Sequence, residues 1–185
     1  MATEKVIMSG FGGQGIMSAG QLLAYAGMLK GKEVSWLPSY GPEMRGGAAN
    51  CAVMISDSPI GSPIIIDDAT SAIIMNLPSL DKFENSVVED GILIINSSLV
   101  KKKASRDDIR VYYIDATDIA YELGNPRVAN MVLLGAYLEI TKIVEIDTAL
   151  EAFKKVYGPS KEHLLPLNKK ALEIGAAEVK QINLK

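Results

Sequence analysis

Hydrophobic and polar residues alternate along the chain with two different periods, one typical of strands and one of helices. Short apolar runs predict strands at residues 5–8, 33–37, 48–55, 71–75, 91–95 and 109–114. Apolar residues at helical spacing predict helices over residues 16–29, 80–87, 126–140, 148–156 and 160–181. Strands mixed with helices indicate an α/β fold, a mostly parallel central sheet flanked by helices. No stretch resembles a linker, so we expect a single Rossmann-like domain over residues 1–185 with a helical last third.

Residues at the ends of these segments predict where several of them start and stop. Pro38 is expected to end the second strand, because proline cannot donate to a sheet ladder. Asn125–Pro126 is typical of a helix start, and the helix beyond it is apolar nearly all round, which predicts burial. Thr148 and Glu151 fit a capping box for the next helix. Pro166 predicts a kink or break in the last helical region.

The composition excludes several classes of function. The chain has 185 residues, a formal net charge of -3, one cysteine and one histidine. A single cysteine cannot form an intrachain disulfide, and an iron–sulfur cluster needs about four thiolates, as a zinc finger needs about four ligands. A mildly acidic chain with 6% aromatic residues lacks both the excess positive charge and the aromatic side chains for base stacking that are typical of nucleic-acid-binding proteins. No apolar stretch reaches the roughly 20 residues of a membrane span, so we expect a cytoplasmic protein.

A glycine-rich loop joins the first predicted strand to the first predicted helix. The residues Gly10, Phe11, Gly12, Gly13, Gln14 and Gly15 have the G-x-G-x-x-G spacing of a phosphate-binding loop. Glycines let a ligand approach the backbone closely, and the helix start presents free N–H groups to an anion. A dinucleotide site needs an acidic residue at the end of the second strand, yet Glu33 stands at its start. The spacing leaves open a dinucleotide, another phosphate-bearing ligand and a tight structural turn.

A second loop with a restricted backbone follows the second predicted strand. It consists of Ser39, Tyr40, Gly41, Pro42, Glu43, Met44, Arg45, Gly46 and Gly47. Loops at the carboxyl ends of parallel strands line the ligand crevice of such sheets. We therefore expect this loop to open on the same edge as the glycine loop. Two interpretations stay open: a structural turn with Arg45 paired to Glu43 or another acid, and an interface or active-site loop.

Three isolated side chains have simpler interpretations. Cys51 begins a buried strand and is expected to fill the core. His163 lies far along the chain from both loops, and we expect a surface or core role for it. Asn130 is polar on an apolar helix and should be hydrogen-bonded, either to the backbone of a neighbouring loop, which we favour, or to a ligand or partner. We predict no catalytic residue and no metal site in this chain.

Taken together, the two loops resemble those of the gamma subunit of the 2-oxoacid:ferredoxin oxidoreductases. The similarity covers nearly the whole chain. It continues through Ala49–Cys51, Ser58–Pro63, Asn130–Ala136 and the positions Asn168, Ala171 and Gly175 of the last helix. Residues 41–47 look closer to the 2-oxoglutarate and branched-chain types than to the pyruvate type.

The resemblance implies a division of labour among subunits. The assembled enzyme decarboxylates a 2-oxo acid on thiamine diphosphate, passes electrons through iron–sulfur clusters to ferredoxin and transfers the acyl group to coenzyme A. Thiamine diphosphate and its Mg²⁺ belong to the alpha and beta subunits, and the clusters to beta or delta. The isolated gamma chain would then be inactive. The resemblance also implies that the loop from Gly10 to Gly15 cradles the phosphates of coenzyme A.

One position departs from the family pattern. Pyruvate-type relatives carry a lysine early in the first helix, where this chain has Gln21. Arg45 or the pair Lys30 and Lys32 would have to supply that charge. The alternative function is a stand-alone Rossmann-type nucleotide-binding protein or an NAD-dependent dehydrogenase, which the misplaced Glu33 and the shortage of acid–base groups disfavour.

Overall fold

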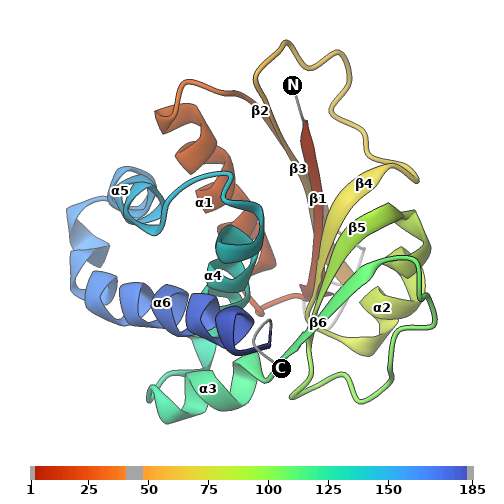
Figure 1. Ribbon diagram of the computed structural model, residues 1–185. Helices are drawn as coiled ribbons and strands as arrows, with labels where there is room; N and C mark the ends of the chain where they lie inside the picture. The colour runs from red at the N-terminus through yellow and green to blue at the C-terminus, as the bar shows by residue number, and fades with distance from the viewer. Residues whose placement is uncertain (1–2, 41–47, 183–185) are drawn as a thin grey trace.

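The computed structural model describes residues 3–40 and 48–182, which form one sheet with helices on its faces (Figure 1). The strands are β1 (Glu4–Phe11), β2 (Glu33–Tyr40), β3 (Ala48–Ser56), β4 (Ala69–Ile74), β5 (Val87–Asn96) and β6 (Arg110–Ile114). The α-helices are α1 (Ile16–Leu29), α2 (Leu77–Phe83), α3 (Ala116–Glu122), α4 (Ala129–Thr141), α5 (Ile146–Tyr157) and α6 (Leu165–Ile182). Short 3₁₀ helices are η1 (Glu84–Ser86), η2 (Pro126–Val128) and η3 (Pro159–Leu164).

The sheet has the order β2-β3-β1-β4-β5-β6. Neighbouring strands from β1 through β4 and β5 to β6 pair in parallel, whereas β3 is antiparallel to both β1 and β2. Within the described sheet, β3 alone therefore runs against the other strands. This confirms the predicted α/β class and mostly parallel sheet. The carboxyl ends of β1, β2, β4, β5 and β6 consequently share one edge.

Two hydrophobic cores lie on the two faces of the sheet, because successive side chains of a strand point to opposite faces. Along β1, Val6 and Met8 join the larger core under α1, α4, α5 and α6, whereas Ile7 joins the smaller core beside α2 (Figure 1). Central strands that are buried on both faces have continuous apolar sequences. This explains why β4 and β5 could be predicted from continuous apolar runs that show no alternation of apolar and polar residues.

Helix α4 is buried along most of its length, as its apolar sequence predicts. Every residue from Ala129 to Leu138 is buried. A Cβ atom added at Gly135 would lie 2.0 Å from the carbonyl oxygen of Leu172, and one added at Gly175 would lie 1.9 Å from that of Val132. The backbones of α4 and α6 therefore touch at these glycines. Neither α4 nor any other described helix is long and apolar enough to cross a membrane.

Two predicted boundaries near the helices are confirmed. The side-chain oxygen of Asn125 accepts the N–H of Arg127 at 3.1 Å and caps the segment before α4. The first turn of that segment is the 3₁₀ helix η2, so α4 itself begins at Ala129. Pro166 lies where η3 gives way to α6, which is the predicted break.

Other boundaries differ from the prediction. Strand β2 continues through Pro38 to Tyr40, because β2 is an edge strand, where proline is tolerated. Helix α5 begins at Ile146, and the predicted capping box is wrong. The Thr148 hydroxyl bonds to the Glu145 carboxylate at 3.3 Å instead of capping the backbone.

The remaining differences between the predicted and the observed elements concern short helices. The helix predicted over residues 80–87 is α2, which starts at Leu77 behind Asn76, whose side-chain oxygen accepts the Ser79 N–H at 2.9 Å. Val87 already belongs to β5. Helix α3 was not predicted, because its 7 residues are too few to show a helical period.

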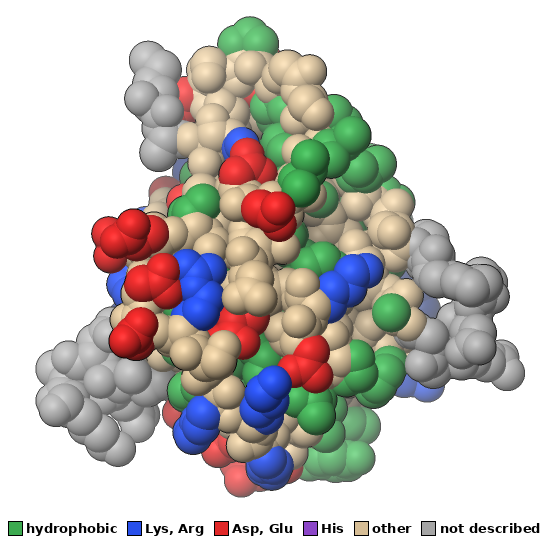
Figure 2. Space-filling view, turned by 90° about the vertical axis from the view of Figure 1, so that its right-hand side faces the viewer, with side chains coloured by type: hydrophobic (Ala, Val, Ile, Leu, Met, Phe, Trp, Pro, Cys, Tyr) green, Lys and Arg blue, Asp and Glu red, His purple; other side chains and the backbone are tan. Residues whose placement is uncertain are grey.

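The face of the sheet that carries α2 has a thinner covering than the helical face (Figure 1). Figure 2 views the molecule from this side, and hydrophobic side chains gather on its upper part. Ile64 and Ile66, in the connection from β3 to β4, are 58% and 70% exposed. Exposed apolar side chains that gather in this way are typical of a surface that contacts another protein.

Candidate functional site

The glycine loop forms a tight turn between β1 and α1. Gly13 and Gly15 have φ angles of 96° and 76°, in the left-handed region that glycine adopts without strain. The N–H of Gln14 donates to the Phe11 carbonyl at 3.1 Å, and its side-chain Oε1 accepts the Phe11 N–H at 2.6 Å. These bonds fix the shape of the turn within the chain itself.

The start of α1 presents backbone N–H groups beside this turn. Gly10 and Phe11 end β1, Gly12–Gly15 form the turn, and Gly15 is the N-cap of α1 without a side-chain capping bond. The Gly15 carbonyl accepts the N–H of Ala19 at 3.0 Å, which is the opening bond of the helix. The N–H groups before Ala19 therefore point out of the helix start. Together with the positive end of the helix dipole, they favour an anion.

A cavity of about 210 Å³, which we name the edge cavity, lies beside the turn. It is lined by residues that follow the carboxyl ends of several strands, namely Gly13, Gln14, Met75, Leu99, Thr117, Pro126, Arg127 and Ala129. Open α/β sheets bind their ligands at this edge. The edge cavity is therefore the candidate ligand site.

Arg127 is the cation that lines the edge cavity, and the sequence analysis missed it. It is exposed, and no ion pair joins it within the described residues. The capping bond from Arg127 to Asn125 places it at the start of the helical segment. A cation there opposes the helix dipole. An arginine directly after an Asn-Pro helix start was thus a signal for an anionic ligand.

Lys30 and Lys32 do not supply the charge that is missing at Gln21. Both lie beyond the C-terminal end of α1, opposite to the glycine turn. Lys30 pairs with Glu145 at 2.5 Å, and Lys32 pairs with Asp57. This part of the hypothesis is wrong, and Arg127 is the described cation that lies beside the turn.

The second predicted loop is described only at its flanks. Gly41, Pro42, Glu43, Met44, Arg45, Gly46 and Gly47 lie outside the described residues. Ser39 and Tyr40 belong to the end of β2 rather than to a loop. Tyr40 is paired with Ala49, and Ala48 is paired with Phe11. The segment from 41 to 47 therefore starts and ends at the edge of the sheet that carries the glycine turn.

Asn130 ties α4 to the glycine turn. Its Nδ2 donates to the Gly15 carbonyl at 2.9 Å, which confirms the expected bond to the backbone of a neighbouring loop. A Cβ atom at Gly15 would come within 2.5 Å of this Nδ2, so the contact requires glycine. The Oδ1 of Asn130 is buried and has no hydrogen-bond partner within the described chain.

Two further cavities lie beside α4. One of about 250 Å³, the helical cavity, is lined by residues of the first turn of α1, of η2 and α4, and of α5, η3 and α6. Among them are Arg127, Asn130, Phe153, Tyr157, Lys161 and Asn168. Arg127 lines both the helical cavity and the edge cavity, so both lie beside the start of α4.

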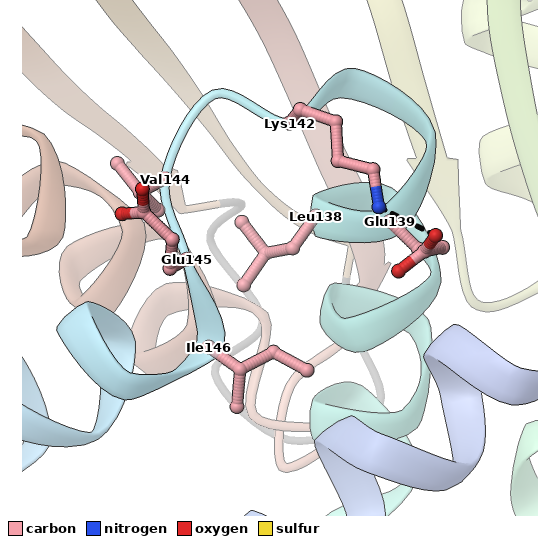
Figure 3. Close-up of a pocket in the computed structure, with 6 residues that line it drawn as sticks. All are labelled: Leu138, Glu139, Lys142, Val144, Glu145 and Ile146. Carbon is pink, nitrogen blue, oxygen red and sulfur yellow. Dashed lines mark ion pairs between the residues drawn. The ribbon is translucent and has the colours of Figure 1, made fainter.

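The other cavity, of about 320 Å³, lies at the C-terminal end of α4 (Figure 3). Lys142 pairs with Glu139 at 2.5 Å and lowers the pKa of that carboxyl, with a further contribution from Lys180. The hydrogen bond from Lys30 likewise lowers the pKa of Glu145. The described carboxylates of this cavity are thus already paired within the chain, and it is not a candidate site.

Cys51 fills the core, as predicted. Its side chain is fully buried, and its Sγ donates to the Ile16 carbonyl at 3.7 Å. Burial raises the pKa of the thiol from 9.0 to about 12, although the neighbouring indole N–H of Trp36, a potential donor to the thiolate, opposes part of this rise. The thiol is therefore neutral in the folded chain at ordinary pH.

We expect Cys51 to resist alkylation by iodoacetamide at pH 8 in the folded chain and to react once guanidinium unfolds it, because the thiolate is the nucleophile. The folded pKa of Cys51 lies above the unfolded one. Its contribution to the free energy of unfolding is therefore fully present below pH 9 and is lost as the pH rises toward 12. Mass spectrometry counts the labelled thiols, and rapid labelling of the folded chain would contradict this account.

A sequence model of the family described as pyruvate ferredoxin/flavodoxin oxidoreductase matches residues 5–178. The chain belongs to this family. The ketoisovalerate oxidoreductase subunit VorA of Methanothermobacter thermautotrophicus is 38% identical over 174 residues, a match that covers 93% of this chain and 35% of VorA. The chain therefore spans about a third of the length of this relative.

Two solved structures have the same fold. The gamma subunit of a keto/oxoacid ferredoxin oxidoreductase from Geobacter sulfurreducens matches with a TM-score of 0.81 at 29% identity, over 96% of this chain and 99% of that one. A 2-oxoglutarate:ferredoxin oxidoreductase from Magnetococcus marinus, with 2-oxoglutarate, coenzyme A and succinyl-CoA bound, matches with a TM-score of 0.88 at 24% identity, over 98% of this chain and 32% of that one. The resemblance to the gamma subunit is confirmed.

These likenesses do not support the alternative of a stand-alone NAD-dependent dehydrogenase. His163, the single histidine, is exposed on η3 and does not line the edge cavity. Glu33 begins β2, whereas an acid that binds a ribose stands at the carboxyl end of that strand. The described part of the site thus lacks the groups that this alternative requires.

Proposed function

We propose that this chain works as the gamma subunit of a complex that oxidatively decarboxylates a 2-oxo acid to acyl-CoA and CO₂ and reduces ferredoxin. In this proposal its own task is to bind coenzyme A at the sheet edge and to hold the complex together. The observation that carries the proposal is the glycine turn next to the start of α1, whose Gly13 and Gln14 line one cavity together with Arg127. Coenzyme A is a substrate whose phosphate groups match both the start of α1 and Arg127.

The geometry assigns a role to each part of the turn. The N–H groups at the start of α1 donate to one phosphate of coenzyme A, since Gly13 and Gly15 put no side chain in the way. Arg127 offers a planar guanidinium that donates two parallel hydrogen bonds to a phosphate. Hydrogen bonds to charged groups contribute about 1.5–3 kcal/mol. The chain thereby orients coenzyme A, and the chemistry takes place on partner subunits.

The partner subunits carry the redox and decarboxylation chemistry. Thiamine diphosphate and Mg²⁺ belong to the alpha and beta subunits, and the iron–sulfur clusters belong to beta or delta. The segment 39–47, with Arg45, contacts the coenzyme or the alpha subunit, since both of its flanks lie beside the glycine turn. The exposed Ile64 and Ile66 are consistent with a surface that a partner covers. The complex works in the cytoplasm and contacts neither nucleic acid nor a membrane.

The substrate is a branched-chain 2-oxo acid or 2-oxoglutarate rather than pyruvate. VorA, a relative with 38% identity, is named for ketoisovalerate. The enzyme from Magnetococcus marinus, with the same fold, is named for 2-oxoglutarate. The choice between these two acids depends on the subunits that bind thiamine diphosphate.

Co-expression with the products of the neighbouring genes tests the proposal. We expect the chain to elute from a size-exclusion column with subunits that contain thiamine diphosphate and iron–sulfur clusters. The purified complex should oxidise a 2-oxo acid only when both coenzyme A and ferredoxin are present. The chain alone should show no turnover with NAD. A chain that elutes alone, or that reduces NAD by itself, would contradict the proposal.

A further inference from the structure

A groove of about 450 Å³, which we name the outer groove, lies between α5 and the start of α6. Figure 1 shows α5 at the outer side of the helical layer, away from the sheet. Leu150 of α5 and Leu165 and Pro166 of α6 form the apolar part of the groove. Leu150 and Leu165 are half-buried, and Pro166 is exposed. Among the described residues only these two helices line the groove, so a second molecule can reach its apolar part.

Four charged side chains border the outer groove, two acids and two lysines. Glu151 and Lys169 already have partners on their own helices, at 3.4 Å and 3.8 Å. Asp147 and Lys154 are exposed, and neither joins an ion pair within residues 3–40 and 48–182. The groove therefore offers one acid and one base to a second molecule.

Asp147 and Lys154 lie on one stripe of α5. They are two helical turns apart, which places them on the same face of the helix. Another face of α5 is buried in the core through Ala149, Ala152 and Phe153. Leu150 lies close to the midpoint between Asp147 and Lys154. A stripe with an acid at one end and a base at the other matches an identical stripe that is turned through half a circle.

We propose that the outer groove is an interface between two copies of this chain that are related by a two-fold axis. In this arrangement α5 of one copy runs antiparallel to α5 of the other, and the axis passes beside Leu150. Asp147 of each copy lies opposite Lys154 of the second copy, and the two Leu150 side chains meet between these pairs. Antiparallel helices also place the positive end of each helix dipole beside the negative end of the other.

A second copy fits this groove better than an unrelated protein because the groove is complementary to itself. The two-fold axis repeats each contact, so one acid and one base per chain give two ion pairs across the interface. Exposed ion pairs contribute little to affinity, and the apolar part of the groove consists of few side chains. We therefore expect a weak dimer with a Kd on the order of 10–100 µM.

Sedimentation equilibrium of the full chain, with charge reversals on α5, tests this interface. Asp147→Lys places two lysines opposite each other on both sides of the axis, and it should weaken the dimer at least ~10-fold. Lys154→Asp should do the same with two acids. The double variant Asp147→Lys/Lys154→Asp restores opposite charges at both places and should regain the affinity of the wild type.

Asp107→Lys is the matched control, because it changes the net charge equally. Asp107 is exposed before β6, forms no ion pair within the described chain and does not line the groove. It should leave the dimer unchanged. A wild-type chain that stays monomeric at ~1 mM, a dimer that Asp147→Lys does not weaken, or a double variant that fails to regain it would overturn the proposal.

Leu150→Cys extends the test to the assembled oxidoreductase. The two-fold axis brings the new thiols of two copies together, so the oxidant diamide should join two gamma chains by a disulfide, which a non-reducing gel detects. The native Cys51 is fully buried and stays out of this reaction. A disulfide to a different subunit, or none, would overturn the proposal. The proposed function would stand in every case, because self-association requires neither coenzyme A nor the partner subunits.

Discussion

Replacing Gly135 with alanine is expected to lower the free energy of unfolding by roughly 3 kcal/mol, and Gly175→Ala should have a similar effect. The added Cβ atom would lie 2.0 Å from the Leu172 carbonyl oxygen or 1.9 Å from the Val132 carbonyl oxygen. Both obstacles are backbone atoms of a neighbouring helix, which cannot rotate away as a side chain can. Helices α4 and α6 would have to separate, and α4 is buried on all sides. Thermal unfolding followed by circular dichroism should show a drop of roughly 6–12 °C in Tm.

Gly61→Ala provides the control for this prediction. A Cβ atom at Gly61 meets no described atom within 4 Å, and its backbone is not in the left-handed region. We expect a change within about 0.5 kcal/mol. If Gly135→Ala melted at the same temperature as Gly61→Ala, the close crossing of α4 and α6 would be contradicted.

Arg127→Ala is expected to raise the KM for coenzyme A roughly 10- to 100-fold, because a hydrogen-bonded charge pair contributes about 1.5–3 kcal/mol. The guanidinium lines the candidate site and contacts no described carboxylate, so its removal leaves no buried charge behind. Steady-state kinetics of the assembled enzyme should leave the KM for the 2-oxo acid unchanged. The KM of Arg127→Lys for coenzyme A should lie between those of the wild type and Arg127→Ala, since lysine keeps the charge but not the planar fork.

Arg110→Ala is the matched control for Arg127. Arg110 begins β6, at the opposite edge of the sheet, and donates to the Asp90 carbonyl at 3.2 Å. Its loss should not change the KM for coenzyme A. An unchanged KM in Arg127→Ala, or an equal rise for the 2-oxo acid, would contradict the proposed role of Arg127.

The sheet and its cores could be predicted from the sequence, because their signals are local. Val6, Ile7 and Met8 form one apolar run, and the structure buries them on the two faces of the sheet. The glycine spacing likewise predicted a turn between strand and helix. The buried helix α4 followed from a sequence that is apolar all round. In each case neighbouring residues carry the whole pattern.

Features that depend on tertiary structure could not be predicted in the same way. Arg127 reaches the glycine turn only because α4 docks beside α1 and Asn130 bonds to Gly15. The extension of β2 through Pro38 depends on its position at the sheet edge. The two paired lysines at the end of α1 could not be distinguished from free ones by sequence alone. The sequence around such residues does not indicate which residues they will contact in the folded chain.

Calorimetric titration of the assembled oxidoreductase with coenzyme A tests the central claim most directly, with Gly13→Ala compared against Gly31→Ala. Both glycines have positive φ angles, 96° and 71°, and a Cβ atom at either meets no described atom within 4 Å. Both variants thus place an alanine at a positive φ angle, but of these two glycines only Gly13 lines the edge cavity. The account predicts that Gly13→Ala weakens coenzyme A binding at least ~10-fold while Gly31→Ala binds like the wild type. Equal affinity in all three proteins would contradict it.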